Sequence, residues 1–137
     1  MAHATNFKHD MDTRVDDALD KKAEAEKTWR DCCKAVDARD HRRCRATGKK
    51  TDPDAVGLLR GHRAHIVYRS AGGPDTPENV ITLSPEAHNA EHKNKLRIEF
   101  LDQALGANGP CEFWKKDEAG NWFLWRREVA VGRFERD

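Results

Sequence analysis

Hydrophobic positions are sparse in the first third of the chain, and the pattern there predicts one long helix. Residues 15–38 contain no glycine or proline and are rich in Ala, Lys and Glu, which favour helix formation. Thr13, followed by Asp16 three residues later, is typical of a helix start. We therefore expect a helix over residues 13–39. Residues 1–12 are polar and lack periodicity, so we expect them to be flexible.

Short hydrophobic runs in the second half predict strands and one short helix. Residues 65–68 and 79–83 are β-branched or aromatic runs on either side of a loop rich in glycine and proline, so both are predicted strands. Ser84-Pro85-Glu86 should begin a helix, because Ser caps it and Pro suits its first turn. Residues 96–100 should form a further strand, and residues 112–125 a β-hairpin.

These elements predict an α+β protein with a compact core over residues 40–95 and a β-rich extension over residues 96–137. A length of 137 residues fits one domain. Charged residues make up 36% of the chain and hydrophobic residues only 37%, so the core must be small. No segment approaches the roughly 18 apolar residues of a membrane span. Four irregularly spaced cysteines suit a reducing compartment, and we expect a cytoplasmic protein.

The formal net charge of +1 hides an uneven distribution of charge along the chain. Residues 41–69 hold eight Lys or Arg and two acidic residues, whereas both flanking segments are acidic. A basic block of this density suits contact with phosphate groups. The block also contains His41, His62 and His65, three of the seven histidines. The block is therefore a candidate phosphate-binding surface that the net charge does not indicate, with an ordinary solvated loop as the alternative.

Three histidines and an asparagine fall on the predicted strand–loop–strand–helix unit. His65 lies on the first strand and Asn79 opens the second. His88 and His92 are four residues apart on the following helix, so both side chains lie on one face. Imidazole suits general-base work near neutral pH, and a pair at this spacing can chelate a metal ion. The unit is therefore a candidate site for metal-dependent chemistry.

These residues resemble a known motif. The stretch Arg63-Ala64-His65-Ile66-Val67-Tyr68-Arg69-Ser70-Ala71-Gly72-Gly73-Pro74-Asp75, followed by Asn79-Val80-Ile81-Thr82-Leu83, His88 and His92, closely resembles the HNH endonuclease motif. The separations of 14 residues from His65 to Asn79 and 9 from Asn79 to His88 fit that family. The resemblance covers about a third of the chain, residues 44–92. It implies a ββα-metal HNH core within residues 40–95, flanked by the long N-terminal helix and the C-terminal β-hairpin.

The resemblance implies a metal-dependent endonuclease that hydrolyses DNA phosphodiester bonds, encoded by a bacterium or a phage. His65 would be the general base, and Asn79 would hold the loop and orient His65. His88 would be a metal ligand, and His92 a further ligand or its partner. One divalent ion is expected, Mg²⁺ first, with Mn²⁺, Ni²⁺ or Zn²⁺ as alternatives. The residues expected to contact the DNA backbone are Arg45, Lys49, Arg60, Arg63 and Arg69.

Two positions depart from the family pattern. Many members carry Asp or His as a ligand where this chain has Ala64, so a weakened or inactive DNA-binding module is the alternative function. His62, three residues before His65, is a candidate substitute. Many members also hold a structural zinc with two Cys-x-x-Cys pairs, of which only Cys44 is present, so we expect no such zinc. A different, poorly spaced zinc set would comprise Cys32, Cys33, His41 and Cys44.

Two features outside the motif leave further alternatives. Trp114, Trp122 and Trp125 are expected in the core of the hairpin, with stacking on nucleic-acid bases as the alternative. The polar helix of residues 13–38 offers a surface for a protein partner or for dimerisation. A third interpretation of the chain is therefore an interaction protein that docks through this helix.

Overall fold

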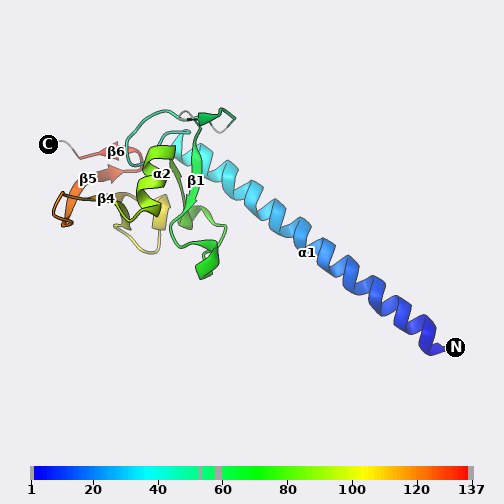
Figure 1. Cartoon of the computed structure of the whole chain (residues 1–137). Helices are drawn as coiled ribbons and strands as arrows, with labels where there is room; N and C mark the ends of the chain where they lie inside the picture. The colour runs from blue at the N-terminus through cyan, green and yellow to red at the C-terminus, as the bar shows by residue number, and fades with distance from the viewer. Residues whose placement is uncertain (1, 53, 58–59, 136–137) are drawn as a thin grey trace.

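The computed structural model describes residues 2–52, 54–57 and 60–135 (Figure 1). The protein is α+β, with a long N-terminal helix, two antiparallel sheets and a short second helix. Strands β1 and β2 form one sheet, and β3 to β6 form the other in sequence order. The elements are α1 (Ala2–Asp40), β1 (His62–His65), β2 (Val80–Leu83), α2 (Pro85–His92), β3 (Leu96–Phe100), β4 (Cys111–Lys116), β5 (Trp122–Ala130) and β6 (Arg133–Phe134).

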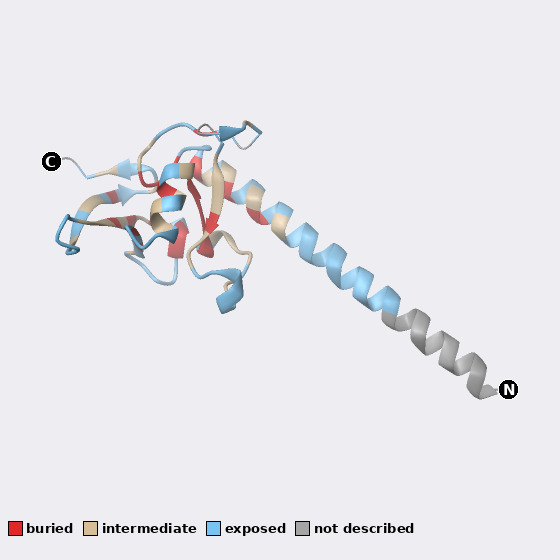
Figure 2. Ribbon diagram, in the orientation of Figure 1, coloured by how far each residue is buried: buried red, intermediate tan, exposed pale blue. Residues whose placement is uncertain are grey.

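Helix α1 begins at Ala2, so the predicted start at Thr13 is wrong, and residues 2–12 are helical. Nothing between these positions interrupts a helix, because the chain has neither glycine nor proline there. The helix projects from the body as a rod, and residues 15–28 are all exposed (Figures 1 and 2). From Trp29 onward it packs on the body. In the described part of the chain, no helix is long and apolar enough to cross a membrane.

The first sheet and helix α2 form a compact unit of two strands and a helix. Strand β1 ends at His65 instead of beginning there, so the prediction of a strand over residues 65–68 is wrong. The chain turns directly after it, at residues 69–71, in a short 3-10 helix. Ala64 pairs with Ile81, and both are buried. The predicted start of α2 is confirmed, because Ser84 Oγ accepts a hydrogen bond from the Ala87 N–H at 3.3 Å.

The second sheet confirms the predicted strand and hairpin and extends both. Strand β3 covers Leu96–Phe100 as expected, and it pairs with β4 of the hairpin. Strand β5 continues to Ala130 and pairs with the short β6. One hydrophobic core joins this sheet to the first, because residues from both sheets and α2 pack together. Its buried members are Cys44, Ala46, Ala64, Ile81, Leu83, Ala87, Leu96, Ile98, Ala107, Cys111 and Phe113.

A buried arginine ties the core to the end of α1. Arg45 is 2% exposed, and its Nε and Nη2 donate to both carboxylate oxygens of Glu128 at 3.0 and 2.6 Å. Its Nη1 donates to Asp40 Oδ1 at 3.0 Å and to the Ala107 carbonyl at 2.8 Å. Burial favours the neutral form of Asp40, but hydrogen bonds and charge from Arg39 and Arg45 outweigh it and hold the pKa of Asp40 below its ordinary value. This network joins α1, β5 and the loop before β4.

Candidate functional site

A cleft of about 330 Å³ opens beside β1, between the loop that follows this strand and helix α2. His65, His88 and His92 all line it, so three of the four motif residues share one cleft. Asn79, the fourth, is buried. The full lining is Arg63, Ala64, His65, Tyr68, Arg69, Ser70, His88 and His92.

His65 is fixed by contacts on its ring face and at one nitrogen. Its Nε2 lies 2.8 Å from Asp75 Oδ1, and its ring stacks on Trp29 of α1 with centroids 5.2 Å apart. Arg69 completes the set, because its Nε donates to Asp75 Oδ1 at 2.9 Å and its guanidinium carbon lies 4.5 Å from the Trp29 ring centroid. The long helix therefore contributes a side chain to the site.

The charge of Asp75 assigns the proton of neutral His65. Burial favours the neutral carboxyl, but hydrogen bonds from Arg69 and His65 outweigh it and lower the pKa of Asp75 below its ordinary value. An ionised carboxylate only accepts hydrogen bonds, so His65 Nε2 must carry the proton. The lone pair of His65 is then on Nδ1. This is the arrangement that a general base needs.

Asn79 closes the loop between the two strands, which is the loop contact that the family resemblance implied. Its Oδ1 accepts from the Val67 N–H at 2.9 Å, and its Nδ2 donates to the carbonyls of Val67 and Pro74, both at 3.0 Å. Gly73 lies where any Cβ would fall 1.7 Å from the Val67 carbonyl oxygen, so only glycine fits. The closed loop brings Asp75 back to His65.

Three potential metal ligands lie on one turn of α2. The ligand atoms of His88, Glu91 and His92 all lie within 4.8 Å of one another, and the two histidine Nε2 atoms are 2.9 Å apart. Tyr68 donates its hydroxyl to the Glu91 carboxylate at 2.8 Å, and its ring stacks on His92 with centroids 5.3 Å apart. Sequence analysis missed Glu91, although a carboxylate three residues after His88 and next to His92 was a readable signal.

His88 is the central imidazole of a row of three. Its Nδ1 lies 2.8 Å from His62 Nδ1, on the side opposite to the Nε2 that faces His92. Burial, together with the charges of His92 and His62, lowers the pKa of His88 to about 4. The imidazole is therefore neutral at pH 7, as a metal ligand must be.

The donor set fits a divalent transition ion better than Mg²⁺. His88 and His92 offer imidazole nitrogens and Glu91 a carboxylate, and imidazole suits Zn²⁺ or Ni²⁺. Mg²⁺ prefers oxygen ligands in octahedral geometry. We therefore place Ni²⁺ and Zn²⁺ ahead of the Mg²⁺ that the sequence put first.

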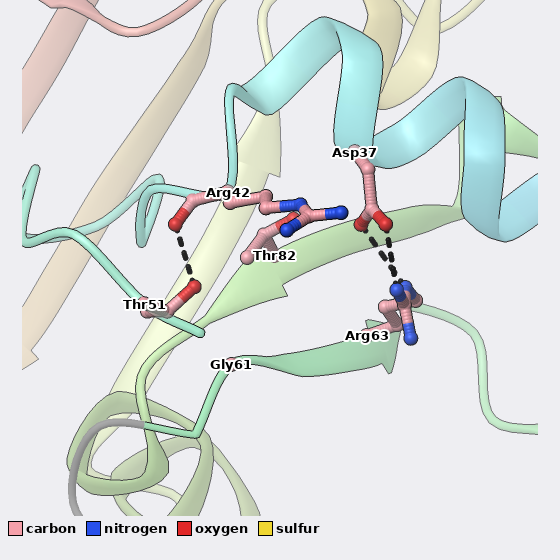
Figure 3. Close-up of a pocket in the computed structure, with 6 residues that line it drawn as sticks. All are labelled: Asp37, Arg42, Thr51, Gly61, Arg63 and Thr82. Carbon is pink, nitrogen blue, oxygen red and sulfur yellow. Dashed lines mark hydrogen bonds and ion pairs between the residues drawn. The ribbon is translucent and has the colours of Figure 1, made fainter. Parts of the chain in front are cut away.

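The residues predicted to contact DNA fall into three groups. Arg45 was assigned wrongly, because its buried guanidinium is enclosed by protein partners and cannot reach a phosphate. Arg63 is bound to Asp37 of α1, with Nη2 and Oδ2 2.6 Å apart (Figure 3), and Arg69 is bound to Asp75. Lys49 and Arg60 are exposed.

The positions of the cysteines correct one further expectation, and those of the tryptophans correct part of another. The alternative zinc set is not assembled, because Cys32 packs with Val36 and Val80 while Cys44 lies in the other core cluster. The three tryptophans of the hairpin are half-buried, Trp125 packs against the core cluster as expected, and each lies beside a cation. Arg97 and Lys116 each lie 5.0 Å from the Trp122 ring centroid, Arg97 lies 6.0 Å from that of Trp114, and Lys115 lies 3.5 Å from that of Trp125.

Comparison with known proteins adds no relative from which a function can be transferred. The chain matches no protein-family model, and no curated protein and no solved structure matches it. The resemblance to HNH endonucleases therefore rests on the motif residues and on the geometry of this cleft.

Proposed function

We propose that the protein is a metal-dependent endonuclease of the HNH type, which hydrolyses phosphodiester bonds in DNA. One observation carries the proposal. His65, with Nδ1 left as the basic nitrogen, shares a cleft with a His–Glu–His set that can hold a divalent ion. In this assignment, β1, β2 and α2 correspond to the two strands and the helix of a ββα-metal core.

His65 and Asp75 supply the proton transfer. His65 Nδ1 takes a proton from the water that attacks the phosphorus atom, and the ring then carries a positive charge. The bond from phosphorus to the leaving sugar oxygen breaks, and that oxygen takes a proton from solvent. The Asp75 carboxylate, 2.8 Å from Nε2, stabilises that charge and stays ionised. Trp29 and Asn79 position these two residues. Trp29 stacks on the face of the His65 imidazole, and Asn79 holds the loop that carries Asp75. His65 is therefore held both by the loop, through Asp75, and by α1, through Trp29.

His88, Glu91 and His92 would hold the ion. When bound, the ion supplies positive charge that offsets the negative charge developing on the phosphate oxygens. Tyr68 fixes the Glu91 carboxylate, and burial raises the pKa of the Tyr68 hydroxyl to about 12, so this hydroxyl remains a donor at neutral pH. Arg63 and Arg69 line the same cleft and are positioned to meet the DNA backbone without reading its sequence.

A DNA-binding module without catalysis is the second candidate, and Ala64 is the observation that favours it. Ala64 is 3% exposed and packs in the core, so β1 offers no ligand at this position. A module of this kind would bind DNA with a steep dependence on salt concentration but would not cleave it.

Plasmid nicking with Ni²⁺, Zn²⁺, Mn²⁺ or Mg²⁺ tests the proposal. We expect wild-type protein to nick supercoiled DNA, EDTA to abolish nicking, and His65→Asn to slow it roughly 100-fold or more. The matched control is His41→Asn, because His41 is exposed and has a positive φ of 53° that asparagine tolerates. Nicking by His65→Asn at the wild-type rate would refute the endonuclease assignment. DNA binding without cleavage under any ion would establish the binding module instead.

A further inference from the structure

His62 does not line the cleft, yet it contacts the central histidine of the candidate metal site. Its Nδ1 lies 2.8 Å from His88 Nδ1, and the two rings meet edge-on at 80° with centroids 5.0 Å apart. His88 uses its other nitrogen, Nε2, toward His92. The two nitrogens of His88 thus face different neighbours.

The side of His88 that would receive an ion follows from the lining of the cleft. His88 and His92 line it with His65, whereas His62 does not. The nitrogen that His88 turns to His92 is Nε2, and Glu91 completes the set on this side. An ion that serves the cleft is therefore bound at Nε2 of His88, and not at Nδ1.

This choice determines where the His88 proton is. Neutral imidazole has one N–H and one lone pair, and a lone pair on Nε2 for the ion leaves the proton on Nδ1. The acceptor at 2.8 Å is His62 Nδ1, whose own proton is then on Nε2. Histidine ligands commonly donate their second N–H to a fixed acceptor, which sets their tautomer and orientation.

We propose that His62 is a positioning residue of the metal site, which accepts the His88 Nδ1–H and holds Nε2 toward the ion. The inference rests on the metal site of the proposed function. It explains how β1 contributes without a ligand at position 64. His62 and Ala64 lie two residues apart and so on the same face of β1, and Ala64 belongs to the same buried core cluster as Ala87 of α2. The strand therefore reaches α2 through His62.

Zinc titration by calorimetry, with three forms of the full chain, measures the role of His62. His62→Phe keeps a ring against His88 but has no acceptor, and we expect zinc affinity to fall about 10-fold to 100-fold. His62→Asn retains an acceptor oxygen and should recover part of that loss. His41→Asn is the matched control and should bind as wild type. Wild-type zinc affinity in a folded His62→Phe protein overturns the inference.

Nitrogen-15 NMR of the zinc-loaded wild-type protein gives a second readout that needs no variant. We expect the metal at Nε2 of His88, the proton at Nδ1, and no metal-bound nitrogen on His62. A metal-bound His62 nitrogen overturns the inference by making this residue a direct ligand. If zinc binding responds to His62 but wild-type protein never cleaves DNA, the inference stands and the proposed nuclease fails. If wild-type protein cleaves DNA while His62→Phe binds zinc normally, the proposed nuclease stands and the inference about His62 fails.

Discussion

Asp75 determines how His65 can act, although it lies ten residues away in sequence. Its carboxylate faces His65 Nε2 and also accepts from Arg69, so the negative charge is fixed between two donors. A charged acceptor forms stronger hydrogen bonds than a neutral one. The carboxylate therefore both selects the tautomer of His65 and stabilises its protonated form.

We expect Asp75→Asn to slow DNA nicking about 10-fold to 100-fold, which is less than the roughly 100-fold to 10,000-fold cost of losing a general base outright. The amide keeps the shape of the side chain but removes the charge that stabilises imidazolium. Single-turnover nicking across pH measures the effect. Asp31→Asn is the control, because Asp31 is an exposed residue of α1 that forms a surface ion pair with Lys27. Equal rates for Asp75→Asn and wild type would contradict this role.

Residues of the site were predictable where spacing carried the information. His88 and His92 share a helix face whatever the rest of the fold, and the structure places both in one cleft with His65. Asp75 and His62 were not assigned in this way, because their contacts depend on how the loop closes and on how β1 meets α2. No local periodicity encodes such contacts.

Helix α1 has an exposed part and a part that packs on the body of the protein. Residues 15–28 are all exposed (Figure 2), whereas the Trp29 ring stacks on His65 and lies beside the Arg69 guanidinium. Farther along, Asp37 binds Arg63 of β1, and Cys32 and Val36 pack against Val80. The last third of the helix therefore packs against the cleft and the core.

A deletion and a point substitution in α1 should consequently behave differently. We expect deletion of residues 2–20 to leave the free energy of unfolding within about 0.5 kcal/mol of the full chain. Trp29→Ala should cost about 1–2 kcal/mol, below the 3–5 typical of a buried aromatic because Trp29 is half-buried, and should slow nicking. Urea unfolding and nicking measure both. A deletion as damaging as Trp29→Ala would show that the exposed part contributes to the body.

At the level of elements, local chemistry predicted where helices and hairpins form better than where strands end. The Ser84-Pro85 start of α2 and the strand Leu96–Phe100 were both correct, since caps and alternation are local signals. β1 was displaced toward the N-terminus because the loop held by Asn79 takes the residues after His65 out of the sheet. That loop closure is a tertiary contact, which the hydrophobic pattern does not encode, and the pattern alone therefore placed the strand at residues 65–68.

At the scale of the whole molecule, Arg45 is a buried residue that links distant segments and is not a surface cation. The sequence placed it in the basic block, yet the fold buries it between Asp40 and Glu128, which are far apart in sequence. Nothing in the local sequence distinguishes it from its exposed neighbour Arg43. Glu128 reaches Arg45 through the pairing of β5 with β4, so the local sequence around Arg45 does not encode this ion pair.

Arg45→Met should lower the free energy of unfolding by about 3–5 kcal/mol at pH 7, because two buried carboxylates lose their partner. Asp40 has a lowered pKa in the folded protein, so its stabilising effect is full above its ordinary value near 4 and is lost as the pH falls through the folded value. Carboxylates without Arg45 bind protons more readily, and the difference between variant and wild type should shrink toward pH 4. Urea unfolding at pH 7 and 4 measures this, with Arg43→Met as control. A pH-independent difference would contradict it.

The fold also determines which cations of the basic block are exposed and could contact DNA if the proposed function holds. Arg45 is internal and Arg63 and Arg69 are engaged with acids, whereas Lys49 and Arg60 are exposed. A cation contributes to the salt dependence of DNA binding by displacing counterions from one phosphate. The exposed pair should therefore contribute to affinity independently of the cleft.

We expect Lys49→Ala and Arg60→Ala each to weaken binding to a short duplex and to reduce the slope of log affinity against log salt by ~0.9. Fluorescence anisotropy over a range of salt concentrations, with EDTA present to prevent cleavage, measures the slope. Lys34→Ala is the matched control, because Lys34 is exposed on α1 and lies outside the basic block. The DNA-facing surface would lie elsewhere if the control and the two variants changed the slope equally. An unchanged slope in both variants, with binding still salt-dependent, would instead assign the phosphate contacts to Arg63 and Arg69 in the cleft.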